Sequence, residues 1–187
     1  ESVPQLEALI QSDNALVASA AVTALGKIAT PAATDALASA VENTSGRLHR
    51  DVLDAYLECA DALAEAGNTS RAMEIFNQLY DSSQPTPVQA AALTGIIKNS
   101  DDPGEQILSV LQDGSIAMKE VAIPLINEVE DVSNLYALAG ELDNLQPQTQ
   151  IQLLTALEEY GDSAVLNVVL EAAESPNDQV SLAAIRA

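Results

Sequence analysis

Large apolar residues recur at intervals of three and four positions along most of this chain, which is the spacing of one face of an α-helix. The pattern is clearest in residues 12–43, where an alanine-rich run carries Val22 and Leu25. A Thr30–Pro31 step follows, and it suits an N-cap residue followed by the first residue of a new helix. A second apolar run then continues to the end of the stretch. The stretch therefore predicts two helices joined by a tight turn, which is one helical hairpin.

Similar hairpins recur to the end of the chain. With Val17 as the reference, equivalent positions follow at intervals of 30 to 36 residues, at Val52, Val88, Met118, Thr149 and Val180. Repeats of this length are typical of helical solenoids, in which each unit packs on its neighbours. The sequence therefore predicts an all-α fold, an α-solenoid (α-α superhelix) of stacked antiparallel hairpins with about 11–12 helices. We expect one continuous array over residues 1–187, in which residues 2–10 form the second helix of a first hairpin.

Other positions of the repeat also carry the same type of residue in successive hairpins. Five residues after each reference stands a large apolar residue, which supports the register of the repeat: Val22, Leu57, Leu93, Ile123, Leu154 and Ile185. Thirteen residues after four of the references stand residues that favour N-caps: Thr30, Asp101, Asp131 and Asp162. Because each lies where a second helix must begin, we interpret this column as caps and not as metal ligands. Pro124 lies inside a first helix, which it is expected to bend.

The hairpin of residues 12–43 resembles a known repeat. The residues that carry the likeness are Val17, Ala20, Ala21, Ala24, Leu25, Gly26, Pro31, Ala32, Ala33 and Leu37. Their order is similar to that of the HEAT repeat in its short bacterial form. Four full units and two partial ones cover nearly the whole chain. The resemblance implies stacked hairpins that act in protein–protein interaction.

Residues 47–85 resemble a tetratricopeptide hairpin more than a HEAT hairpin. The matching residues are Tyr56, Cys59, Ala60, Leu63, Gly67, Ala72, Phe76, Leu79 and Pro85. This likeness places Cys59 in the packed seam between two helices, so we expect a buried thiol and not a reactive one. Such a mixture of repeats is similar to repeat regions of large exported bacterial proteins. It implies a periplasmic or extracellular location in a bacterium.

Charge narrows the choice of partners. The chain has 28 acidic and 7 basic residues, which gives a formal net charge of −21. Such a surface repels phosphate backbones, so we expect no nucleic-acid partner, and no apolar run is long enough to predict membrane insertion. The acidity serves solubility, a salty habitat or a basic partner, and composition leaves these three open. The chain starts at Glu1 without a leader, so we expect a fragment or mature piece of a longer protein.

Candidate chemistry is sparse. His49 is the single histidine and Cys59 the single cysteine, and the sequence has no Gly-rich phosphate loop. We therefore predict no catalytic residues, no cofactor and no metal. Acidic groups such as Glu158–Glu159 and Glu128, Glu130 and Asp131 are interpreted as solvated helix ends. The densest positive cluster is formed by Arg47, His49 and Arg50, which we predict as a possible partner contact.

These observations favour a non-catalytic interaction scaffold or a structural spacer. The expected partner is a protein or peptide, and a basic one would suit the acidic surface. Other domains of the parent chain are the alternative partner. The alternative is a HEAT-like lyase-type enzyme or accessory factor, of the kind that attaches bilin pigments. A DNA glycosylase would need basic grooves and aromatic stacking, which this acidic chain without tryptophan does not offer. The last unit is expected to leave an apolar face open near residues 180–187, which favours end-to-end association.

Overall fold

The computed structural model describes residues 2–160 and 165–187, and these form an all-α fold. Within the described residues there are twelve α-helices and two short 3₁₀ segments, and no strand. This confirms the all-α part of the predicted fold class and the number of helices, whereas the solenoid arrangement stays a prediction. The chain divides into two compact units, 1–95 and 96–187, and the division falls inside helix α6 (Thr86–Asn99).

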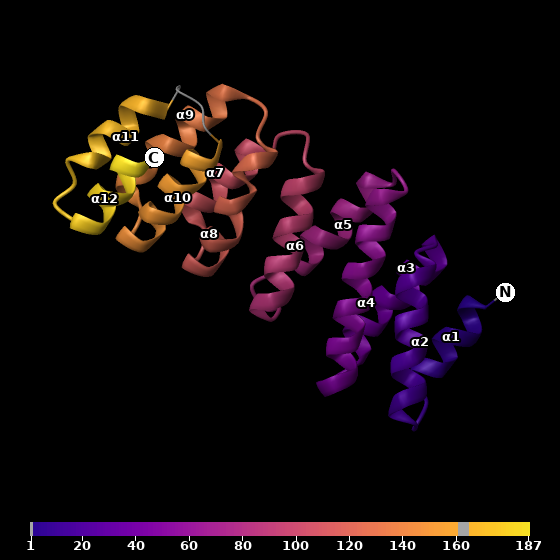
Figure 1. The fold of residues 1–187 in the computed structure, drawn as a ribbon. Coiled ribbons are helices and arrows are strands. Elements are labelled where there is room, and N and C mark those ends of the chain that lie inside the picture. The colour runs from indigo at the N-terminus through magenta and orange to yellow at the C-terminus, as the bar shows by residue number, and fades with distance from the viewer. Residues whose placement is uncertain (1, 161–164) are drawn as a thin grey trace. The chain divides into compact units, whose positions relative to one another are not determined.

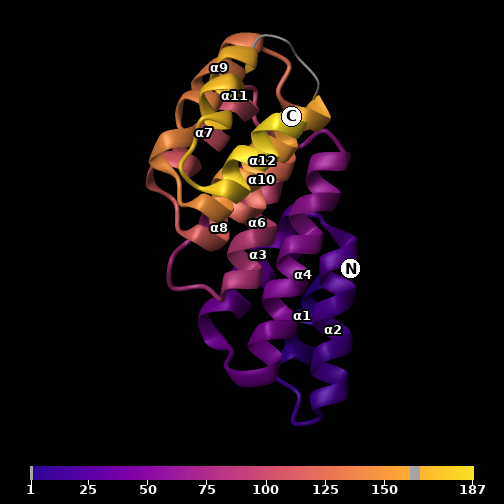
Figure 2. The ribbon, with the colours of Figure 1, turned by 60° about the vertical axis from the view of Figure 1, so that its left-hand side comes forward.

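The first unit contains five complete helices. They are α1 (Val3–Ile10), α2 (Ala15–Ile28), α3 (Pro31–Asn43), α4 (Gly46–Glu65) and α5 (Thr69–Leu79). Helix α2 contacts α1, α3 and α4, and α4 also contacts α3 and α5, as Figures 1 and 2 show. Two of the expected hairpins are therefore α2–α3 and α4–α5. The second of these spans the tetratricopeptide-like stretch, and Gly67 provides the positive φ of its turn.

The second unit is built in a similar way from shorter helices. They are α7 (Pro103–Asp113), α8 (Ile116–Ala122), η1 (Ile123–Glu128), α9 (Val132–Gly140), η2 (Leu142–Asn144), α10 (Pro147–Tyr160), α11 (Leu166–Ala173) and α12 (Asp178–Arg186). Helix α10 contacts α8, η1 and α12, while α7 contacts α8, η1 and α9. Helix α12 packs on both α10 and α11. Consecutive first helices therefore lie beside each other in this unit as well.

Two of the four predicted caps are confirmed. Thr30 Oγ1 accepts a hydrogen bond from Ala33 N at 3.4 Å, and Asp131 Oδ1 accepts one from Ser133 N at 2.8 Å. The prediction for Asp101 was wrong by one residue. The cap of α7 is the next residue, Asp102, because Pro103 occupies the first turn and fixes where the helix begins. Asp162 lies outside the described residues.

The predicted bend at Pro124 takes the form of a change of helix type. Helix α8 ends at Ala122, and the chain continues as the 3₁₀ segment η1. Proline has no N–H to donate to the carbonyl four residues earlier, so the α-helical ladder is interrupted there. The 3₁₀ turn keeps Ile123 and Ile126 buried. The apolar pattern is thus preserved although the helix type changes.

Small residues let the helices of the first unit approach closely. A Cβ atom on Gly26 would lie 2.8 Å from the backbone oxygen of Ala55, so α2 and α4 meet almost backbone to backbone. In the same unit, the ring of Phe76 occupies the space that a Cβ atom on Gly95 would need. The column four residues after each reference is buried throughout: Ala21, Tyr56, Ala92, Ala122, Leu153 and Ala184. The alanine-rich composition therefore serves close helix packing.

Cys59 is fully buried, as predicted from the tetratricopeptide likeness. Its sulfur lies 3.3 Å from Oγ1 of the equally buried Thr34, which joins α4 to α3. Burial is the main cause that raises the pKa of the Cys59 thiol. No helix in the described part of the chain is both long and apolar enough to cross a lipid bilayer.

Candidate functional site

A groove of about 490 Å³ in the second unit lies where two loops meet. One loop joins α6 to α7, and the other joins η1 to α9. Five carboxylates and one amine line the groove: Asp101, Asp102, Glu128, Glu130, Asp131 and Lys98. We call these residues, with Asn134, the acidic groove.

Two of the five carboxylates have structural roles. Asp102 Oδ1 accepts hydrogen bonds from Glu105 N at 3.0 Å and from Asn134 Nδ2 at 2.8 Å. The second bond joins the start of α7 to α9. It requires Gly104, because a Cβ atom there would lie 2.5 Å from the Asn134 side chain. The Asp-Pro-Gly sequence at residues 102–104 therefore fixes one lip of the groove.

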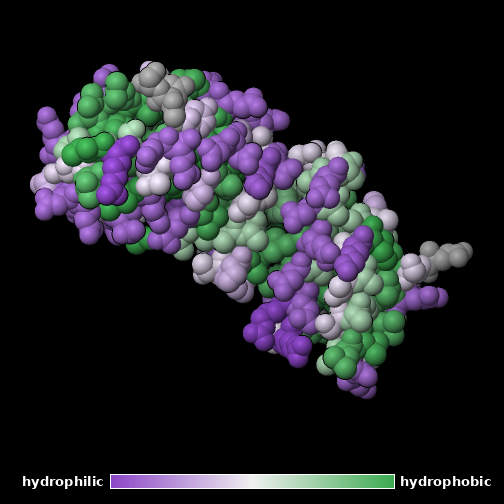
Figure 3. All heavy atoms as spheres, in the orientation of Figure 1, coloured by the Kyte–Doolittle hydropathy of each residue, from purple (hydrophilic) through white to green (hydrophobic). Residues whose placement is uncertain are grey.

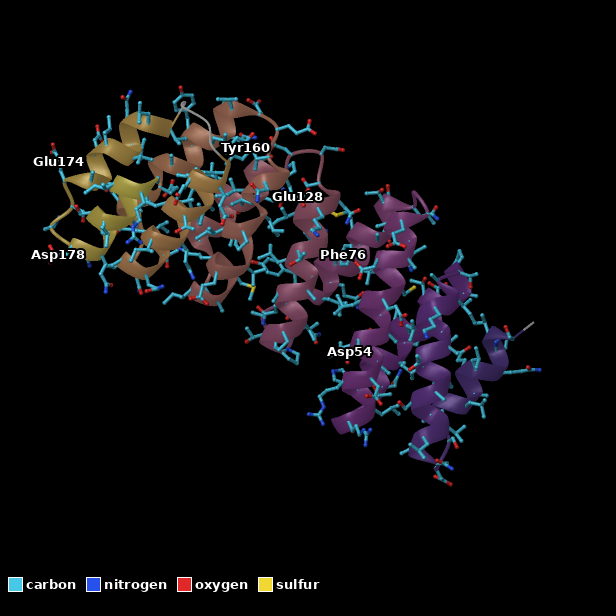
Figure 4. All side chains as sticks on the ribbon, viewed as in Figure 1. Asp54, Phe76, Glu128, Tyr160, Glu174 and Asp178 are labelled. Atoms are coloured by element: carbon cyan, nitrogen blue, oxygen red, sulfur yellow. The ribbon has the colours of Figure 1, made fainter. Side chains whose placement is uncertain are left out.

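The second lip is held by Asp131 and Tyr160. Ser133 donates to Asp131 Oδ1 from both its backbone N and its hydroxyl, and these bonds lower the pKa of Asp131. Tyr160 Oη donates to the backbone oxygen of Val129 at 2.9 Å. Figure 4 shows Tyr160 and Glu128 on this part of the second unit. The backbone between η1 and α9 is thus anchored from α10.

The remaining three carboxylates make no hydrogen bond or ion pair with other side chains in the part of the chain that the structure describes. Asp101, Glu128 and Glu130 are exposed, and none of them takes part in an ion pair among the described residues. The ion pairs found there both involve Arg71, which contacts Asp35 and Glu74 in the first unit. The acidic groove therefore presents unpaired negative charge on a fixed frame.

From the sequence, Asp101 and Asp131 are interpreted as helix caps and Glu128 and Glu130 as solvated helix ends, and Asp102 is not singled out. The structure brings residues 101–102 and 128–131 to one groove. The signal that could have found it is the N-cap column itself. Loops at the same phase of consecutive hairpins lie beside each other when the hairpins stack, so acidic residues that flank the caps gather in one place.

The predicted contact cluster lies elsewhere, at the start of α4. Arg47 and Arg50 are exposed one turn apart, and His49 is half-buried between them. The Nδ1 atom of His49 lies 3.4 Å from Thr44 Oγ1, which ties the ring to the preceding turn. None of the three lines the acidic groove. The cluster stays a prediction.

A smaller acidic groove of about 170 Å³ lies between α2 and α4 of the first unit. It is lined by Ser19, Thr23, Asp51, Asp54, Ala55 and Glu58, and Asp54 is labelled in Figure 4. Within the described residues, no group of three His, Cys, Asp or Glu side chains is arranged to hold a metal ion. Both grooves therefore offer negative charge and hydrogen-bond acceptors, and the larger one is the candidate site.

No model of a known protein family matches this chain, and no curated protein matches it either. The resemblance to HEAT and tetratricopeptide repeats therefore stays a prediction from the sequence.

Proposed function

We propose that this chain is a non-catalytic interaction scaffold, an α-solenoid of HEAT-like hairpins that binds a basic segment of a partner protein in its acidic groove. The observation that carries the proposal is the meeting of two loops whose carboxylates outnumber their amines by five to one. Three of these carboxylates, Asp101, Glu128 and Glu130, have no internal partner among the described residues. Lysine and arginine side chains would supply the missing positive charge.

The composition of the groove favours a peptide over an apolar small molecule. Val129 and Pro103 are the main apolar residues in its lining, so an apolar ligand would bury little matching surface. The long side chains of lysine and arginine reach carboxylates while their stems stay on the surface. The net charge of −21 would also draw a basic segment toward the chain at low salt.

A binding role agrees better with the chemistry of the groove than catalysis does. The two side chains most often used as general base and nucleophile, His49 and Cys59, both lie on α4 and outside this groove. Cys59 is buried, and His49 is held by Thr44. The carboxylates of Asp101, Glu128 and Glu130 are exposed to solvent, whereas acid–base catalysis by paired carboxylates needs a desolvated cleft. We therefore assign the groove to recognition.

The test is the binding of a fluorescent nonapeptide of alternating lysine, arginine and serine, measured by anisotropy. The groove variant combines Asp101→Asn, Glu128→Gln and Glu130→Gln. A control variant combines Asp143→Asn, Glu158→Gln and Glu159→Gln, which removes the same charge from exposed positions outside the groove. We expect the groove variant to weaken binding by about tenfold or more and the control by less than about threefold.

Salt provides the second measurement. Binding should weaken between about 50 and about 300 mM NaCl, because exposed charges are screened over that range. Equal losses in the groove and control variants would show that net charge alone attracts the peptide, and would refute the assignment to the groove. An absence of binding at low salt would favour a structural spacer in place of a scaffold.

A further inference from the structure

Helix α9 (Val132–Gly140) combines an uncharged sequence with exposed apolar side chains. It is the one α-helix without an acidic or basic residue among those that the structure describes, although the chain carries 28 acidic residues. Hydrophilic residues cover much of the visible face of the second unit (Figure 3), whereas on α9 Val132 is 39% exposed and Tyr136 is 54% exposed. The helix begins directly after Asp131, and its residue Asn134 lines the acidic groove. An uncharged surface therefore borders the acidic groove.

Tyr136 occupies a position where the repeat otherwise places polar residues. It stands eighteen residues after its reference, Met118. Polar residues stand at the same phase of the other hairpins: Asp35, Ser70, Gln106 and Asn167. Three of these four are exposed, so the position faces solvent in the folded hairpins. Folding therefore does not require an aromatic residue there.

Tyr136 is also the one exposed aromatic residue of the chain. The structure describes all four tyrosines and the single phenylalanine, of which Tyr56 and Phe76 are buried and Tyr80 and Tyr160 are half-buried. Tyrosine is among the residues that contribute most to binding at protein interfaces, because its ring offers a large apolar surface at a small cost in side-chain entropy. The exposure of Tyr136 on the helix that borders the groove therefore indicates a contact with a partner.

Val132 and Tyr136 form one apolar surface, which we call the α9 strip. Residues four apart in an α-helix lie on the same face, with Cβ atoms about 5–6 Å from each other. Helical side chains lean toward the N-terminus, so the Tyr136 side chain is directed over the turn that begins at Val132. Leu135 and Leu138 are fully buried and fix which face of α9 points to solvent. The α9 strip thus begins next to Asp131, a carboxylate of the groove.

We propose that the basic segment bound by the acidic groove carries a large apolar side chain beside its basic residues, and that this side chain packs on the α9 strip. The contact rests on the proposed function of the groove and adds a requirement that charge alone does not set. An apolar side chain can cover Tyr136 without burying a carboxylate of α9, because this helix carries none. The spacing agrees, since the five residues of helix from Asp131 to Tyr136 advance about 7.5 Å and two residues of extended peptide advance about 7 Å.

The experiment measures the fluorescence anisotropy of lengthened forms of the basic nonapeptide with the whole chain. Each probe carries, at its amino or its carboxyl end, one additional serine and one test residue, which is phenylalanine, alanine or arginine. We expect phenylalanine at one of the two ends to tighten binding to the wild type by about fivefold or more relative to alanine at that end. This gain should persist between about 50 and about 300 mM NaCl, because salt does not screen an apolar contact, whereas the affinity of every probe should fall.

Variants of Tyr136 locate the contact. Tyr136→Ala should reduce the affinity ratio of the phenylalanine and alanine probes to about twofold or less, while Tyr136→Phe, which keeps the ring, should retain the wild-type ratio. Ile116→Ala is the matched control, since Ile116 is 51% exposed and follows the end of α7 opposite the groove. It should bind all probes like the wild type. Unchanged circular dichroism spectra would confirm that each variant folds.

The alanine probe reports the acidic groove without the α9 strip, so the two proposals fail in different ways. If the alanine probe binds but phenylalanine adds nothing at either end, or if its gain survives Tyr136→Ala, the contact with the α9 strip is refuted and the groove stands. If no probe binds, the proposed function is refuted and the contact falls with it. An arginine probe that gains as much as phenylalanine, and loses that gain in Tyr136→Ala, would show that the ring binds a cation and would overturn the apolar contact.

Discussion

Gly26→Ala tests the close approach of α2 and α4, on which the packing of the first unit depends. In an exposed helix, replacing glycine by alanine stabilises by about 1 kcal/mol, because alanine loses less backbone entropy on folding. At this position the new Cβ atom would lie 2.8 Å from the backbone oxygen of Ala55 and 3.2 Å from its Cα and Cβ. Backbone atoms cannot turn aside as a flexible side chain can. The two helices must therefore separate to admit the methyl group.

The balance of these two effects can be estimated. Overpacking of a close-packed interface typically costs about 1–3 kcal/mol, and separation of the helices also loosens the contacts of Val22 and Leu25, which are both fully buried. The cost at a backbone oxygen belongs at the upper end of that range. After the gain in helix propensity, we expect a net loss of about 1–2 kcal/mol in the free energy of unfolding.

The assay is urea unfolding followed by far-ultraviolet circular dichroism, with amide hydrogen exchange to locate the change. Exchange should speed up in α2 and α4 and stay unchanged in α10, because the clash lies inside the first unit. Gly140→Ala is the matched control. It places a Cβ atom where no other atom lies within 4 Å, so it should be neutral or slightly stabilising. A Gly26→Ala chain as stable as the wild type would refute the close packing of α2 on α4.

Three further predictions concern single contacts. The Cys59 thiol, whose pKa is raised by burial, should react with a thiol reagent about a hundredfold or more slowly in the folded chain than in urea, measured by absorbance. Tyr160→Phe should cost about 0.5–1.5 kcal/mol in urea unfolding, because it removes the bond to Val129, and it should weaken peptide binding to the acidic groove. The pKa of Asp131 is lowered in the folded chain, so its contribution to stability is present above the ordinary carboxyl pKa and lost as the pH falls through the folded value. Ser133→Ala should raise the titration midpoint of Asp131 in an NMR pH series.

Much of the fold follows from the sequence because its signals are local. The apolar spacing set the helices, and Thr30 and Pro31 marked a boundary that the structure keeps. The prediction for the cap of α7 was wrong by one residue, because Asp101 and Asp102 are both good cap residues and the repeat phase pointed to the first of them. The position of Pro124 indicated a disturbance, but not that a 3₁₀ segment would absorb it.

The acidic groove was harder to foresee because it depends on contacts between hairpins. Asp102 and Asn134 are 32 residues apart, and their hydrogen bond requires the small Gly104 between them. Tyr160 reaches Val129 across a similar separation. A sequence pattern reports which residues begin a helix, but it does not report which loop a side chain reaches after the helices pack.

Helix capping does not by itself explain why the capping residues of the acidic groove are charged. Other helices of the same chain begin with uncharged caps, since Asn14, Thr30 and Asn177 accept the same kind of backbone hydrogen bond. Aspartate and asparagine are about equally good caps, so folding alone does not require Asp102 and Asp131 to be charged.

The last prediction follows from that equivalence. The double variant Asp102→Asn and Asp131→Asn should retain helical content and urea stability close to the wild type, because an amide oxygen can still accept the bonds at both helix starts. Its affinity for the basic peptide should nevertheless fall, because two of the five negative charges of the acidic groove are gone. If the urea stability and the peptide affinity of the double variant both fell, the two aspartates would be assigned to capping alone. Loss of affinity with stability preserved would show that the two loops carry their charge for a partner.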